Sequence, residues 1–265
     1  MEFVGYFSAM IMGLSLGLIG GGGSILTVPI LVYLFAQDPL VATTGSLFVV
    51  GATAFVGALN NARKKSVDFK TGLLFAVPSF AGVFVARHFV LPNLPEIIFA
   101  GYGIVLTKAL LVMGAFAVLM VLASRAMIRS GRAMPSVAAG KPAGYASIGW
   151  QGFFVGVTTG FVGAGGGFLI IPALVILLRL PMRIAVGTSL AIIAANSLFG
   201  FAVSANVQDL DWRVLTTITG IGVVGIFVGQ GLSTAINEKV LKKGFGYFVL
   251  LVGALVLVDQ VMKLT

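Results

Sequence analysis

The sequence has no cysteine, only one histidine (His88) and few charged residues, which make up 9% of its 265 positions. Without cysteine there is no disulfide framework, thiolate metal site or thiol nucleophile. A single histidine cannot build a histidine-rich metal site. A soluble domain carries roughly 25% charged and about 45–50% apolar residues, whereas 58% of this chain is hydrophobic. These shortages exclude an ordinary soluble globule and indicate a protein surrounded by lipid.

Basic residues outnumber acidic ones by 17 to 8, which gives a net charge of +9. Such an excess can indicate nucleic-acid binding, but no aromatic and basic surface able to stack bases is visible. The lysines and arginines instead gather in short clusters between apolar runs, as in the cytoplasmic loops of membrane proteins. We therefore expect the lipid bilayer as a partner and no nucleic acid.

Apolar stretches of about 17–25 residues, long enough to cross a bilayer, recur along the chain. Two shorter apolar pieces, Ile25–Phe35 and Phe168–Leu178, each follow a glycine run directly after a longer stretch. We interpret each piece as part of a re-entrant hairpin that enters the membrane, turns at the glycines and leaves on the same side. The expected spans are Phe3–Ile19, Val41–Leu59, Thr71–Phe89, Ile97–Ala123, Ile148–Val162, Ile184–Ser204, Val214–Ile236 and Phe245–Met262.

The basic residues favour the re-entrant interpretation. With both hairpins re-entrant, about 13 basic residues fall on one side, which the positive-inside rule assigns to the cytoplasm. If each hairpin were one crossing, the later basic clusters would move outside. Phe3–Ile19 has no basic segment before it and no small-residue cleavage site, so we do not expect a signal peptide. We expect a multi-pass protein of the cell inner membrane with both termini outside.

The two halves of the chain repeat each other. A shift of 143 residues places GLSLGLIGGGGSILTVPILVYL, from Gly13, over GVTTGFVGAGGGFLIIPALVIL, from Gly156, without a gap. An odd number of crossings before the second copy makes the repeats inverted, as in many carriers. The expected fold is all-α, one integral membrane domain with repeats at 1–123 and 148–265 and a basic cytoplasmic connector at 124–147.

The glycine runs at the two hairpin tips form the candidate substrate site. Pro29 and Pro172 lack an N–H and suit a first helical turn, so we expect the next helix to begin no earlier than each proline. The N–H groups before each proline then lack helical partners and present the positive end of the helix dipole to an anion. The alternative is that the glycines only allow close helix crossing. The candidates are Gly22, Gly23, Gly165, Gly166 and Gly167.

Hydroxyl and amide side chains near the tips could complete this site, because they donate hydrogen bonds to the oxygens of an anion. The alternative for each hydroxyl is a bond to a carbonyl one turn earlier in its own helix. For the amide, the alternative is a bond between helices. The candidates are Ser24, Thr44, Ser46, Thr158, Thr159, Thr188, Ser189 and Asn196.

Several charged residues stand near the expected span ends. Lys108 lies near the centre of Ile97–Ala123 if that stretch is one span, or at the interface if an outer segment ends just before it. Arg87 and His88 end a span, and we expect both at the outer headgroups, where they could attract anions. No acidic residue sits in the middle of a span, so no carboxylate for sodium or proton coupling is evident. We expect no metal and no cofactor.

Asp68 and Asp211 recur at equivalent positions of the two repeats. We expect both to anchor the interface and cap helices. The alternative is a gating ion pair.

A spaced glycine motif, G-x-x-x-G-x-x-G-x-G-G-x-x-x-x-x-P, occurs twice. It stands at Gly13, Gly17, Gly20, Gly22, Gly23 and Pro29, and again at Gly156, Gly160, Gly163, Gly165, Gly166 and Pro172. The doubled motif resembles the sulfite exporter TauE/SafE family, also called the 4-toluene sulfonate uptake permeases, and the resemblance covers nearly the whole chain. The first copy departs from the second at Thr43–Leu47, which stands where the second has Val186–Leu190.

The resemblance implies a membrane carrier that exports small organosulfonate or sulfite-type anions such as sulfoacetate. We expect alternating access around a midplane site. A passive anion channel and a carboxylate transporter of the same fold are the alternatives. An enzyme would need paired acids, a metal site or a nucleophile with its base, and none is present. The sequence leaves the number of subunits open.

Overall fold

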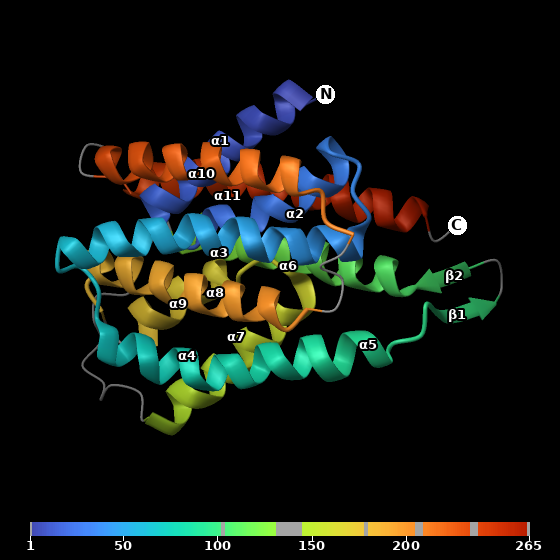
Figure 1. The fold of residues 1–265 in the computed structure, drawn as a ribbon, viewed down its shortest axis with the longest axis horizontal. Helices are drawn as coiled ribbons and strands as arrows, with labels where there is room; N and C mark the ends of the chain where they lie inside the picture. Colours follow the sequence, from blue (N-terminus) through green and yellow to red (C-terminus); the bar gives the residue numbers. More distant parts are fainter. Residues whose placement is uncertain are drawn as a thin grey trace.

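The structure is a computed structural model that describes residues 2–101, 104–130, 145–177, 180–204, 209–233 and 238–263. Apart from one two-stranded hairpin, the described chain is mainly helical (Figure 1). The main helices are α1 (Glu2–Ile19), α3 (Pro39–Arg63), α4 (Phe69–Phe84), α6 (Lys108–Ser130), α7 (Tyr145–Val162), α9 (Met182–Ala202), α10 (Trp212–Leu232) and α11 (Glu238–Met262). The shorter helical segments are η1 (Gly22–Leu26), α2 (Thr27–Pro29), η2 (Ile30–Leu34), η3 (Val85–Val90), α5 (Leu91–Asn93), α8 (Gly167–Pro172) and η4 (Ala173–Leu177).

Within the described residues, 5 helices are long and apolar enough to cross a membrane. They are α3, α4 with its continuation to Asn93, α6, α9 and α10, and shorter apolar helices add Phe3–Ile19, Gly22–Leu34 and Gly246–Met262. Large apolar side chains are exposed on the outer surface, among them Phe7 and Leu73. Apolar surface on this scale requires a lipid surrounding. The prediction of an all-α polytopic membrane protein is confirmed.

Helices of the two halves pack crosswise in matching pairs. Helix α1 packs on α10, and α7 packs on α4. A methyl carbon placed on Gly13 of α1 would lie 2.2 Å from the Gly222 carbonyl oxygen, and one placed on Gly156 of α7 would lie 2.0 Å from that of Ser79. The shift of 143 residues converts one of these contacts into the other. Both interfaces are therefore built alike, with glycine at the point where the backbones meet.

Helices α3 and α9 form the centre of the molecule. In their most apolar windows 67% and 61% of the residues are buried, against 39% or less in α4, α6 and α10. Gly51 of α3 packs on Leu198 of α9, whereas Ser66, just after α3, meets Gly187 near the start of α9. The two helices therefore run antiparallel, as Figure 1 also shows. Inverted repeats require this direction, and the inverted topology itself stays a prediction.

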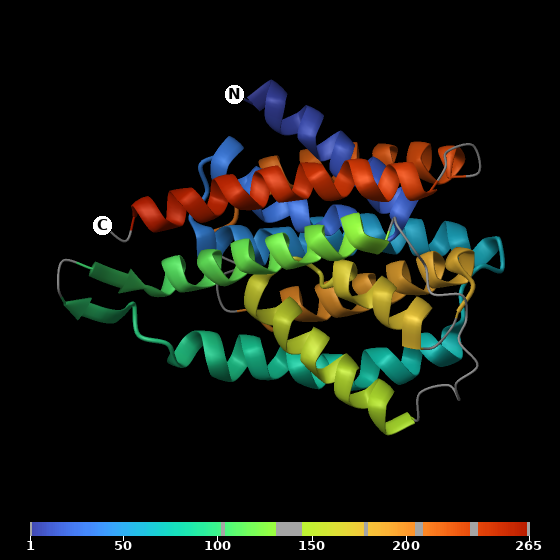
Figure 2. The same cartoon turned by 180° about the vertical axis from the view of Figure 1, so that it is seen from behind.

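Helices α6 and α11 lie side by side along one flank (Figure 2). Gly253 of α11 faces Met120 of α6, whose Cβ lies 2.9 Å from the position of a methyl carbon on that glycine. Helix α6 continues to Ser130, so the first residues of the expected connector 124–147 are helical. The connector from 131 to 144 lies outside the described residues. The division into two repeats and a connector stays a prediction.

The expected single span Ile97–Ala123 is wrong. Strands β1 (Ile97–Gly101) and β2 (Ile104–Thr107) pair antiparallel, and α6 begins only at Lys108. The Lys108 N–H donates to the Glu96 carbonyl oxygen at 3.0 Å, which closes the base of this hairpin. β-branched and aromatic residues such as those of β1 suit a strand as well as a membrane helix. The alternative of an outer segment that ends just before Lys108 is the one that the structure contains.

The helical turns after the glycine runs begin earlier than expected. Helical structure starts at Gly22 in the first run and at Gly167 in the second, before Pro29 and Pro172. The expectation that no turn forms before these prolines is therefore wrong. A proline lacks only its own N–H and restricts the residue before it, so the preceding residues keep their capacity for helical turns. Each proline is followed by a π-helical segment, η2 or η4.

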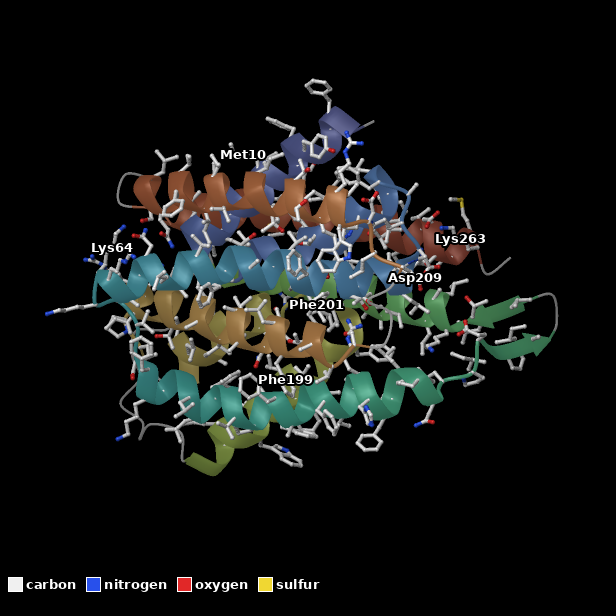
Figure 3. The ribbon with its side chains drawn as sticks, viewed as in Figure 1. Met10, Lys64, Phe199, Phe201, Asp209 and Lys263 are labelled. Carbon is white, nitrogen blue, oxygen red and sulfur yellow. The ribbon has the colours of Figure 1, made fainter. Side chains whose placement is uncertain are left out.

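Asp68 and Asp211 cap helices as predicted. The Asp68 carboxylate accepts hydrogen bonds from the first N–H groups of α4, and Asp211 does the same for α10. The Thr71 hydroxyl also donates to Asp68, at 2.7 Å, and this bond holds the pKa of the Asp68 carboxyl below its usual range. In Figure 3, Lys64 lies at one end of the molecule and Asp209 and Lys263 at the other. The two caps thus lie beside loops at opposite ends.

Candidate functional site

The two glycine tips meet inside the protein. A methyl carbon placed on Gly21 would lie 2.0 Å from the carbonyl oxygen of Gly167, and one placed on Gly167 would lie 2.5 Å from the Cα of Gly21. Both residues are buried. Backbone therefore touches backbone at this point, where the segments after α1 and after α7 come together. The sequence predicted that the two tips converge, and this contact brings them together.

Each tip also contacts the central helix of the other half. Gly20 has a φ of +86° and lies against Ser189 of α9, whose Oγ is 2.8 Å from the position of a methyl carbon on that glycine. Its equivalent, Gly163, has a φ of +76° and lies against α3, where Ser46 Oγ donates a hydrogen bond to the Gly163 carbonyl oxygen. The two predicted serines thus occupy matching positions, one at each tip.

The next glycines of each run pack on the helix before them. A methyl carbon on Gly23 would lie 2.3 Å from the Met12 carbonyl oxygen of α1. One on Gly166, which has a φ of +65°, would lie 2.0 Å from Thr159 Oγ1 of α7. Gly22 is buried as the first residue of η1. The role of these three glycines in binding stays a prediction.

Several predicted hydroxyls bond within their own segments. Ser24 Oγ donates to the Gly21 carbonyl oxygen at 2.9 Å, and Ser189 Oγ donates to that of Val186 at 2.8 Å. Thr158 Oγ1 donates to the carbonyl one turn earlier in α7. Thr188 Oγ1 instead accepts a hydrogen bond from the Asp68 N–H at 2.9 Å, near the start of α9. The first three are committed to local bonds, and Thr188 fastens the loop before α4.

Two unpaired buried hydroxyls lie beside the second tip. Ser197 Oγ and Thr159 Oγ1 are inaccessible and have no hydrogen-bond partner in the described structure. Ser197 Oγ lies 3.1 Å from the position of a methyl carbon on Gly165. Asn196 Nδ2 donates to Ser79 Oγ at 2.7 Å, while its Oδ1 is unpaired. Buried polar groups without a partner are costly, so Ser197 and Thr159 are candidates for binding a polar ligand at the tip, and this role stays a prediction.

Sequence reasoning missed Ser197. The residue lies two helical turns after Ser189 on the same face of α9, and the i, i+4, i+8 spacing is the signal that could have identified it. Thr53 of α3, also unpaired, is the repeat equivalent of Asn196. Thr53 faces Gly222 of α10, which is the repeat equivalent of Ser79. Because glycine has no side chain, Thr53 lacks the bond that Asn196 makes to Ser79.

Arg87 is buried within the protein, and its expected depth at the headgroups stays a prediction. Arg87 is only 6% exposed. Its two terminal nitrogens donate to Thr44 Oγ1 at 3.0 Å and to the Thr43 carbonyl oxygen at 3.3 Å. These partners lie near the start of α3, so the side chain points inward from η3. His88 is exposed as expected and stacks on Phe84 with ring centroids 4.9 Å apart.

Within the described residues, no group of three histidine, cysteine, aspartate or glutamate side chains could hold a metal ion. The polar groups found beside the tips are backbone and hydroxyl groups. A polytopic helical protein in which broken segments from two halves of the chain meet has the architecture of a membrane carrier. Comparison with known families agrees, since the model of the family described as Sulfite exporter TauE/SafE matches residues 6–256. The chain belongs to the TauE/SafE family and is a membrane transporter.

The relatives carry names of the same kind. The chain is 28% identical over 255 residues to a "Probable membrane transporter protein" of Xylella fastidiosa (strain 9a5c), with 94% of this chain and 92% of the relative covered. It is 32% identical over 253 residues to the "Probable membrane transporter protein YunE" of Bacillus subtilis (strain 168), with 88% and 89% covered. No solved structure gives a significant match.

Proposed function

We propose that this transporter exports small organosulfonate or sulfite-type anions, such as sulfoacetate, by alternating access around the point where the two glycine tips meet. The observation that carries the proposal is the contact of Gly21 with Gly167, which joins segments from both halves of the chain at one buried position. The sulfur chemistry of the substrate and the direction of transport rest on membership of the family.

The polar groups at the tips favour an anion. The first N–H groups of a helical segment have no partner inside it, and such segments begin here at Gly22 and Gly167. The unpaired hydroxyls of Thr159 and Ser197 can donate to an oxyanion. No aspartate or glutamate occurs in α3, in α9 or in the tip segments. An ammonium group would therefore find no charged partner there.

The arrangement of the two halves supports alternating access. The central helices α3 and α9 are repeat equivalents that run antiparallel, and the pairs α1–α10 and α4–α7 match each other. Movement of these pairs against the α3–α9 centre would expose the tips first to one side of the membrane and then to the other. We place both termini and the β1–β2 hairpin outside, because this orientation puts most basic residues in the cytoplasm.

Flux measurements in proteoliposomes test the proposed substrate. We expect sulfoacetate and sulfite to give saturable uptake and countertransport, and zwitterionic taurine to be carried poorly, because the helix dipole favours net negative charge. A passive anion channel would conduct without countertransport, and a carboxylate transporter would favour acetate. Taurine flux equal to sulfoacetate flux would contradict a site built from N–H and hydroxyl groups.

Ser197→Ala tests the location of the site. The Ser197 hydroxyl has no partner in the protein, so its loss should leave stability unchanged or raise it, whereas loss of a bond to a charged ligand should weaken affinity about tenfold or more. The matched control is Ser124→Ala on α6, whose buried hydroxyl bonds only to the Val121 carbonyl oxygen. Wild-type affinity for sulfite in Ser197→Ala would place the anion elsewhere.

A further inference from the structure

A cavity with charged lining residues lies at the start of α3, beside the second glycine tip, because Thr43 both lines it and contacts Gly163. Its volume is about 160 Å³, and it lies between the ends of α3, α4–α5 and α6. Liquid water occupies about 30 Å³ per molecule, so the space suits a small ion with a few waters. The lining residues are Leu40, Thr43, Thr44, Arg87, Leu91, Pro92 and Lys108. Two of them are cations and none is an acid.

Arg87 lines this cavity with a guanidinium that lacks a counter-ion. Among the described residues, no carboxylate forms an ion pair with it. Its Nε is buried and has no hydrogen-bond partner. A buried charge without a compensating partner is costly, so Arg87 is a candidate functional residue. The bonds to Thr43 and Thr44 hold the terminal nitrogens in place, but they are neutral and leave the positive charge uncompensated.

Lys108 supplies the second charge. As the first residue of α6 it reaches the cavity, and its side chain is only 12% exposed. Its one ion-pair partner in the described structure, Glu96, is 81% exposed and lies at 3.8 Å from Nζ. A pair this open to water contributes little. An anion in the cavity can therefore interact with both cations without displacing a strong internal partner.

We propose that this cavity is a second anion site, which holds a small tetrahedral or pyramidal oxyanion, such as sulfate or sulfite, between Arg87 and Lys108. Three or more oxygens around one centre can accept from a guanidinium and an ammonium together. That the bound anion is the transported one rests on the proposed function. On the proposed orientation the site lies at the outer mouth of the carrier and receives the anion that leaves the tips.

Among the described residues, the position of the second repeat that is equivalent to Arg87 carries no charge. Gln230 stands at the position of the second repeat that is equivalent to Arg87, and it is also buried. Its amide donates to the Gly57 carbonyl oxygen at 2.9 Å and accepts from Asn60 Nδ2. The neutral amide thus satisfies its bonds within the protein. The two equivalent positions differ in charge although the repeats match in their helix packing, so we expect anion capture to be asymmetric across the membrane.

Binding of inorganic sulfate to the purified full chain tests this site. Thermal unfolding in detergent is followed against sulfate concentration at constant ionic strength. We expect sulfate to raise the unfolding temperature of the wild type, and its apparent Kd to rise about tenfold or more in both Arg87→Gln and Lys108→Gln. Arg87→Lys should recover part of the affinity. The control is Arg213→Gln, an exposed cation at the start of α10, for which we expect no change.

Two results would overturn the proposal. One is a wild type that sulfate does not stabilise, and the other is an unchanged Kd in the two cavity variants. If Arg87→Gln fails to fold, Lys108→Gln still tests the site. We expect this variant to fold, because the ion-pair partner of Lys108 in the described structure is exposed and the pair contributes little to stability. Failure of the proposed transport function looks different. In that case no anion flux occurs in proteoliposomes, while sulfate binding that depends on Arg87 persists.

Discussion

The substitution Gly21→Ala would place one methyl group at the point where the two tips touch. Gly21 has a φ of −90°, which alanine adopts without strain, so the effect comes from contact alone. The added carbon would lie 2.0 Å from the Gly167 carbonyl oxygen and within 2.4 Å of its Cα. Both neighbours are backbone, so relief requires one whole tip to move by about 1 Å or more. Overpacking of this kind costs about 1–3 kcal/mol.

That cost applies only to the conformation in which the tips touch. If this conformation is part of the transport cycle, its population falls about 5–150-fold. We expect a lower unfolding temperature in detergent and sulfite flux in proteoliposomes at least about fivefold below that of the wild type. Ala164 occupies the equivalent position of the second repeat, which indicates that alanine itself is compatible with this type of turn.

Gly220→Ala on α10 is the matched control, because a methyl carbon there meets nothing within 4 Å. In an open helical position the same change should leave flux intact and stabilise the protein by roughly 0.5–1 kcal/mol. Wild-type flux and stability in Gly21→Ala would refute the reasoning. The contact between the tips would then be irrelevant to the cycle.

Two further predictions concern orientation and pH. A cysteine introduced at Asp209 should react with an impermeant thiol reagent in intact cells, and one introduced at Lys64 should not. The two residues lie at opposite ends of the molecule (Figure 3), so labelling of Lys64→Cys alone would reverse the proposed topology. Asp68→Ala should remove the cap of α4 and cost about 0.5–2 kcal/mol at pH 7. Because the folded-state pKa of Asp68 is lowered, its contribution is present above about pH 4 and is lost as the pH falls through the folded-state value. Unfolding temperatures of variant and wild type should therefore converge in acid, and a constant difference down to pH 2 would show that the carboxylate charge is not involved.

The repeat made much of the fold predictable from the sequence. Copies that align without a gap must place equivalent helices at equivalent positions, and α1 and α7 have the same bounds after the shift. The caps at Asp68 and Asp211 follow from local side-chain chemistry. The expectation that glycines mark the point where two halves meet also needed no knowledge of distant contacts, because only glycine permits such an approach.

What the sequence did not predict depends on distant contacts. Arg87 at the end of an apolar stretch has the pattern of a headgroup anchor, and only the start of α3, far away in the chain, provides the partners that bury it. The β1–β2 strands are as apolar as a span, so composition cannot distinguish them from one. Ser197 differs from the other hydroxyls only in having no partner, a property that depends on the packed structure.

The crosswise packing of the helices has a consequence for biosynthesis. The glycine face of α1 belongs against α10, and that of α4 belongs against α7, so neither half of the chain can complete its own interfaces. At about 5–20 residues per second, Gly13 leaves the ribosome on the order of 10–40 s before Gly222 does. During that interval we expect the glycine-bearing faces of α1 and α4 to contact lipid or the insertion machinery. The chain therefore becomes a folded unit only near the end of translation.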